Sequence, residues 1–143
     1  MVACLLLGTP GAAAQDPSSA ADGSGVVVTT DAMSYAPGDP LVATATNGSP
    51  QSIAPQGGIV CQGSPWPFGV QQQADDGSWQ DVVVPRTPPC IGIAVRQLGP
   101  GESQTKTLSA SADPGTYRLT YVFTAADGSQ AVAVSDPYTI AAP

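Results

Sequence analysis

Apolar and polar side chains alternate most regularly along residues 113–124. After a Pro-Gly pair, every second position from 117 to 123 carries an aromatic residue or leucine, while Arg, Thr and Val occupy the positions between them. Successive side chains of a β-strand point to opposite faces, so this alternation predicts a strand with one buried face. We expect it to be the central strand of a β-sandwich.

Shorter runs rich in Val, Ile, Thr and aromatic residues predict further strands, separated by turn residues. Asn47-Gly48-Ser49-Pro50 is a strong turn signal, and Asp76-Gly77 and Asp127-Gly128 predict hairpin turns. No long stretch has apolar residues at helical spacing. We therefore predict an all-β, antiparallel sandwich of about seven to nine strands. The expected strands cover residues 26–30, 41–46, 57–61, 68–73, 79–84, 90–96, 103–108, 117–123 and 131–140.

The composition agrees with one domain built from short strands and turns. The chain has 143 residues, with 16 Gly, 15 Pro and only 10% charged residues. Its net charge is -7, and its four basic residues are scattered. Without a basic patch there is nothing to neutralise phosphates, so the sequence argues against binding to nucleic acids or to anionic lipid surfaces.

Residues 1–14 form an apolar run that ends in three alanines, which predicts a secretory signal peptide cleaved before Gln15. No Lys or Arg precedes this run, so the signal is either truncated or cryptic; the alternative is an apolar tail of the folded domain. Residues 15–25 predict a flexible linker, and 26–142 the domain. No later apolar segment is long enough to span a bilayer. We expect a secreted or extracytoplasmic protein.

Two cysteines remain after the leader, Cys61 and Cys90. An even number of cysteines in a small exported domain favours a disulfide. The bond would close a loop of about 30 residues and stabilise the domain by roughly 3.6 kcal/mol on the chain-entropy model. The alternative is a pair of buried free thiols. A zinc site is disfavoured, because two thiols without histidine do not complete its coordination shell.

Residues Asp113-x-Gly115-x-Tyr117 resemble the Asp-x-Gly-x-Tyr-x-Cys segment of immunoglobulin-fold domains, with Leu119 in place of the inter-sheet cysteine. The resemblance implies that Tyr117 is a tyrosine-corner residue, with its hydroxyl bonded to upstream backbone.

Three further segments, 35–39, 76–79 and 98–102, extend this resemblance to the small immunoglobulin-like domains of exported bacterial proteins. The similarity covers about residues 25–142 and implies an immunoglobulin-like β-sandwich. Cys61 and Cys90 depart from the family pattern, because they are not placed as an inter-sheet pair. A bond between them would be local to the middle of the domain.

The sequence contains few groups suited to catalysis. Histidine is absent, so a Ser or Cys nucleophile lacks its usual base. Lys106 is the single lysine, and the acidic residues lie mainly at predicted turns. Asp75 and Asp76 lack the alternating spacing of a calcium loop, and no glycine-rich loop joins a strand to a helix. We predict a protein that is not an enzyme and has no cofactor or metal.

Binding is the class of function that remains. The preferred hypothesis is a structural or protein-interaction module of the cell envelope or secreted space. A second hypothesis is a carbohydrate-binding module in which Trp66, held between two prolines, stacks on a sugar. A third is a protease inhibitor that presents the segment between Cys61 and Cys90, stiffened by Pro85, Pro88 and Pro89. The ligand, the partner and the oligomeric state stay open.

Overall fold

The computed structural model describes residues 25–84, 87–93 and 96–142. These residues form strands joined by turns and loops, with no helix in the described ranges. The all-β prediction is therefore confirmed. The strands are β1 (Val26–Thr30), β2 (Ser34–Tyr35), β3 (Pro40–Asn47), β4 (Ala54–Pro55), β5 (Gly58–Gln62), β6 (Phe68–Gln73), β7 (Trp79–Asp81), β8 (Thr87–Ile93), β9 (Ser103–Ser109), β10 (Gly115–Thr124), β11 (Gln130–Val134) and β12 (Tyr138–Ile140).

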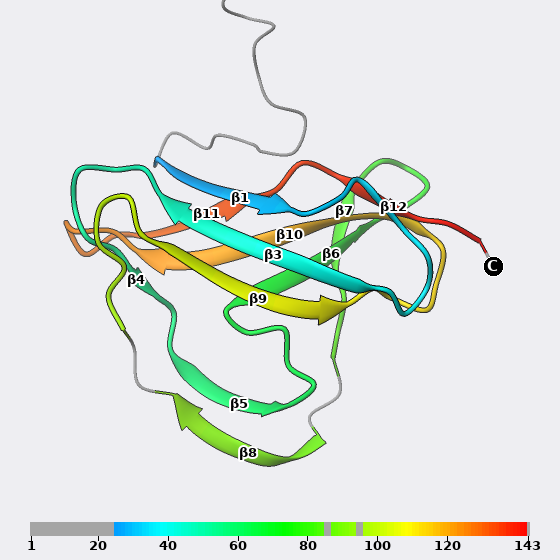
Figure 1. The fold of residues 1–143 in the computed structure, drawn as a ribbon, viewed down its shortest axis with the longest axis horizontal. Coiled ribbons are helices and arrows are strands. Elements are labelled where there is room, and N and C mark those ends of the chain that lie inside the picture. The colour runs from blue at the N-terminus through cyan, green and yellow to red at the C-terminus, as the bar shows by residue number, and fades with distance from the viewer. Residues whose placement is uncertain (1–24, 85–86, 94–95, 143) are drawn as a thin grey trace, which may run out of the picture.

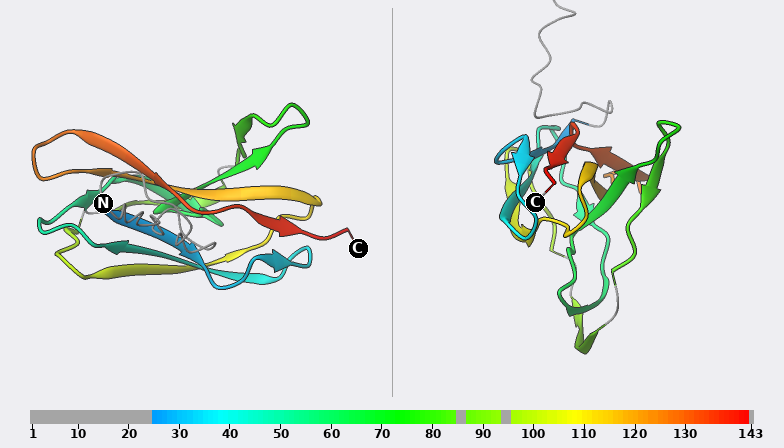
Figure 2. Two further views of the ribbon diagram at one scale, coloured as in Figure 1. Left: turned by 90° about the horizontal axis from the view of Figure 1, so that it is seen from above. Right: turned by 90° about the vertical axis from the view of Figure 1, so that its right-hand side faces the viewer.

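Two sheets face each other across the hydrophobic core, as Figure 2 shows in its left-hand view. The smaller sheet has the order β1-β3-β9, and the larger has the order β2-β12-β10-β6-β7, with β11 and β4 also paired to β10. β2 runs parallel to β12, whereas the other strand pairs are antiparallel. The expectation of a wholly antiparallel fold is wrong at this edge, where the chain crosses from one sheet to the other.

The aromatic face of β10 forms the centre of the core. Tyr117, Leu119, Tyr121 and Phe123 are each at most 1% exposed, as the alternation predicts. They pack against the inner face of the smaller sheet, including Val26 and the alternating small residues of β3. β10 also pairs with four other strands, so it holds the larger sheet together.

The last predicted strand, residues 131–140, is two strands. β11 pairs with the second half of β10, and β12 pairs with its first residues. Between β11 and β12, Ser135 remains hydrogen-bonded to Leu119 of β10. Its backbone N–H donates to the Leu119 carbonyl oxygen and its hydroxyl accepts from the Leu119 N–H, each at 2.9 Å. Pro137 has no N–H to continue the ladder, so the strand is interrupted there.

Two short strands, β2 and β4, were not expected, and two expected strands differ from the prediction by three residues at one end. β7 ends at Asp81 instead of residue 84, and β8 begins at Thr87 and not at Cys90. The predicted leader over 1–14, and the predicted linker over 15–25 apart from Gly25, lie outside the described residues.

Among the described strands, β5 and β8 pair only with each other. Figure 1 draws them as a separate pair of ribbons beside the two facing sheets, and the right-hand view of Figure 2 shows the pair projecting away from them. We call this two-stranded unit, residues 58–62 and 87–93, the arm.

Candidate functional site

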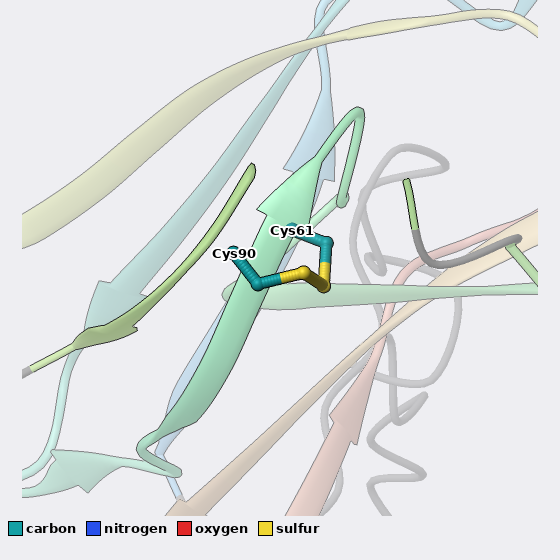
Figure 3. The surroundings of a disulfide bond; sticks show 2 residues. All are labelled: Cys61 and Cys90. Carbon is teal, nitrogen blue, oxygen red and sulfur yellow. A yellow bond between two sulfur atoms is a disulfide. The ribbon is translucent and has the colours of Figure 1, made fainter. Parts of the chain in front are cut away.

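The arm is joined across its two strands by a disulfide. Cys61 and Cys90 are direct cross-strand partners, with Cα atoms 3.9 Å apart, and their sulfur atoms are bonded (Figure 3). The predicted bond is thus present, and it is local to one hairpin-like unit instead of joining the two sheets. The disulfide fixes the register of β5 against β8, which form a two-stranded sheet apart from the other two sheets.

The arm exposes large apolar side chains. Ile59 is 70% exposed and Ile91 is 62% exposed. Ile59 lies opposite Gly92, whereas Ile91 lies opposite Val60, so the two isoleucines are on opposite faces of the arm. Neither β5 nor β8 contains a charged residue. An uncharged element with exposed isoleucines on both faces is unusual on a chain whose net charge is -7.

Trp66 lies in the loop between β5 and β6, where two hydrogen bonds hold it. Its indole N–H donates to the Gln56 carbonyl oxygen at 2.7 Å, and its backbone N–H donates to the Ser64 hydroxyl at 3.1 Å. The residue is half-buried. The indole N–H is therefore bonded to the loop that leads into β5, which favours a role for the ring in holding that loop in place.

Tyr117 lies near the start of β10, just after the loop that contains Asp113. Its hydroxyl donates to the Asp113 carbonyl oxygen at 2.7 Å, which is the bond expected of a tyrosine corner. Gly115 between them has a φ of 155°, and a Cβ there would approach the Gln72 side-chain nitrogen to 3.0 Å. These contacts tie the start of β10 to the loop that precedes it.

Sequence reasoning missed a polar cluster on the outer face of the larger sheet. The guanidinium of Arg118 lies 4.5 Å from the centre of the Trp79 ring, and its Nε donates to Gln71 Oε1 at 2.8 Å. Gln71 in turn donates to Asp81 Oδ1 at 3.0 Å. Trp79 is thus half-buried under Arg118 on the outer face of the sheet and does not belong to the core cluster. The sequence did contain an indication of this cluster, because Arg118 is at an outward-facing position in the alternating pattern of β10.

Asn47 is a second residue whose role the sequence did not show. It is fully buried at the end of β3, and its side-chain nitrogen donates to the carbonyl oxygens of Gln51 and Leu98 at 2.8 and 2.9 Å. Its side-chain oxygen accepts from the N–H and the hydroxyl of Ser49. Asn47 therefore joins the turn after β3 to the segment before β9.

The carboxylates with shifted pKa values stabilise turns. Hydrogen bonds from the Tyr35 hydroxyl and the Val42 N–H lower the pKa of Asp31. Asp76 accepts from the hydroxyl and N–H of Ser78, which lowers the pKa of Asp76 in the same way. Within the described ranges, no group of three or more potential metal ligands lies together, and no helix is long and apolar enough to cross a membrane.

Comparison with known proteins gives structural likenesses only. No protein-family model and no curated protein matches the chain. It is similar to the X-ray structure of the Northeast Structural Genomics Consortium target SoR45, with 17% identity over 87% of this chain and 91% of that chain, at a TM-score of 0.48. It is also similar to a crystal structure from Bordetella pertussis, a protein provisionally designated ApaA (target BeR40), with 15% identity over 92% of this chain and 85% of that chain, at a TM-score of 0.43.

Proposed function

We propose that this chain is a non-enzymatic, extracytoplasmic module with an immunoglobulin-like sandwich that binds another protein through its arm. The observation that carries the proposal is the exposure of Ile59 and Ile91 on an uncharged unit that projects from the two sheets. Burial of one such side chain at an interface contributes about 1.5–3 kcal/mol. Exposed apolar patches on soluble proteins often mark interaction sites.

The disulfide supports the same proposal in two ways. Cross-linking the strands at Cys61 and Cys90 holds the arm in one conformation before binding, so less conformational entropy is lost in the complex. A disulfide also persists in oxidising compartments, which agrees with a location outside the cytoplasm. Val83, which follows β7 in the chain, is another large apolar side chain that is exposed, at 86%.

The two other hypotheses have less support. Binding of a glycan through Trp66 requires an exposed ring face, but the residue is half-buried and the bond from its indole N–H to Gln56 holds it against the segment before β5. An inhibitor segment between the cysteines requires a long accessible loop. That segment instead contains β6 and β7, and Pro88 and Pro89 lie within β8. Pro85 lies outside the described residues.

The experiment compares what the arm and the body of the domain capture. Affinity-tagged protein is cross-linked in an envelope extract of the native host, and bound proteins are quantified by mass spectrometry. We expect Ile59→Ser with Ile91→Ser to reduce capture of a specific partner by at least about tenfold, because at least one buried contact is lost whichever face of the arm the partner covers.

The matched control is Met33→Ser with Val132→Ser, which removes two exposed apolar side chains, 49% and 47% exposed, from the body. This control is expected to capture the partner as the unmodified protein does. Equal capture by both double variants, with the folds intact by circular dichroism, would show that the arm is not the binding surface.

A further inference from the structure

A groove opens between the two sheets on the side where β9 and β7 are the edge strands. Its volume is about 490 Å³, within the range of about 300–1,000 Å³ that is usual for small-molecule sites. Leu41, Val70, Val82, Leu108 and Tyr138 form its apolar walls. The groove is separate from the exposed faces of the arm, although the loop after β5 contributes to its rim.

Lys106, the single lysine of the chain, lines this groove. It is the register partner of Ala43, which is fully buried, so Lys106 belongs to the inner face of the smaller sheet. Gln104 and Leu108 have the same parity, and these three positions of β9 are half-buried while their neighbours are exposed. A cation therefore faces the space between the sheets.

Gln104, the other polar residue on the inward side of β9, has a hydrogen-bond partner, whereas Lys106 has none among the described residues. Gln104 accepts a hydrogen bond from the Tyr121 hydroxyl at 3.0 Å. Among the described residues, the ion pair found is between Arg96 and Glu102, and no carboxylate lies within ion-pair distance of Lys106. An ammonium group at an apolar groove without a protein carboxylate is a ready partner for the carboxylate of a ligand.

We propose that this groove binds a fatty acid, with its aliphatic chain between the sheets and its carboxylate on Lys106. The apolar walls suit a hydrocarbon chain, because its burial removes apolar surface from water. A single ammonium matches a single negative charge. Ligands with many negative charges are disfavoured by the chain's net charge of -7, so a monoanion with an apolar tail fits both the local cation and the overall charge.

The test is an NMR titration of the full-length protein with decanoate, kept below its micelle concentration, and separately with decanol. Decanoate is expected to shift the amide signals of Val70, Lys106 and Leu108 in a saturable way and to bind more tightly than decanol. Lys106→Gln is expected to weaken decanoate binding by about tenfold or more while leaving decanol binding unchanged, because it removes a charge-assisted hydrogen bond only.

Two further variants separate charge at the groove from charge in general. Lys106→Arg keeps the cation and is expected to retain binding, whereas Arg96→Gln removes a cation that is 87% exposed and does not line the groove, and it is expected to have no effect. Equal affinity for decanoate and decanol would overturn the proposal. So would an absence of saturable shifts, or shifts confined to the arm, because either result would show that decanoate does not bind in the groove.

Discussion

The hydroxyl of Tyr117 donates a hydrogen bond to the carbonyl oxygen of Asp113, four residues earlier, at 2.7 Å. This bond ties the start of the central strand to the loop that enters it. The Tyr117 ring is 1% exposed and stacks on Tyr138, with ring centres 6.0 Å apart. One buried phenol therefore fixes the position of the loop that leads into β10, the strand with most partners.

Replacement of this phenol is the first prediction. Tyr117→Phe keeps the ring and removes the hydrogen bond, so we expect the free energy of unfolding to fall by about 1–2 kcal/mol in urea denaturation. Tyr138→Phe is the matched control, because no hydrogen bond of its hydroxyl is found among the described residues. If both variants lose the same stability, the Asp113 bond is not what stabilises the corner.

Asn47 is expected to be the most sensitive polar residue of the core. Asn47→Ala removes one of two donors from each of the carbonyl oxygens of Gln51 and Leu98, takes the acceptor from the Ser49 N–H and creates a small cavity, so we predict a loss of about 2–4 kcal/mol. Thr46→Ala, which removes an exposed hydroxyl bonded to Ser103, is expected to cost less than about 1 kcal/mol. Thermal and urea unfolding measure both, and similar losses would contradict this assignment.

The disulfide is expected to stabilise the domain without being needed for its core. The sequence separation of Cys61 and Cys90 is 29 residues, so replacing both with Ser should lower the free energy of unfolding by about 3–4 kcal/mol. Neither cysteine belongs to the core cluster between the sheets. The near-ultraviolet circular dichroism of the core tyrosines should therefore persist, and its loss in native buffer would show that the arm is needed to hold the sheets together.

Acid is expected to weaken the fold partly through Asp31. The pKa of Asp31 is lower in the folded chain than in the unfolded chain, where an aspartate titrates at about 3.9. Its contribution to stability is thus present above about pH 4 and is lost as the pH falls through the folded-state pKa. Urea unfolding from about pH 6 down to pH 2 should show a smaller pH dependence for Asp31→Asn than for the unmodified protein. An unchanged dependence would assign the effect to other carboxylates, such as Asp76.

Alkali is expected to act through the buried tyrosines. Burial raises the pKa of Tyr35 and of Tyr121 from 10.0 to about 12, and it raises the pKa of Tyr138 as well. The unfolded chain therefore ionises first, so stability should hold up to about pH 10 and fall as the pH rises toward about 12. Tyrosinate absorbance and circular dichroism, followed together, check this. Ionisation of all tyrosines near pH 10 with the fold retained would contradict it.

Much of the larger sheet was predictable because its residues carry the pattern themselves. Tyr117 and Leu119 alternate with Arg118 and Thr120, and this local period indicates which side chains are buried. The pairing of β2 with β12 was not predictable, because each strand is only two or three residues long and the partners are far apart in the chain. The arm and the groove at Lys106 also depend on pairings between strands that are far apart in the chain.

The sequence by itself determined the all-β class and the inward face of β10 through local alternation, and it favoured a bond between Cys61 and Cys90 because few partners were possible. Only the tertiary structure decided which face of β9 is buried. Residues 103–109 are polar at both parities except Leu108, so alternation alone assigns no phase. The register with β3 places Lys106 beside Ala43, and the same long-range pairing leaves β5 and β8 outside the two sheets.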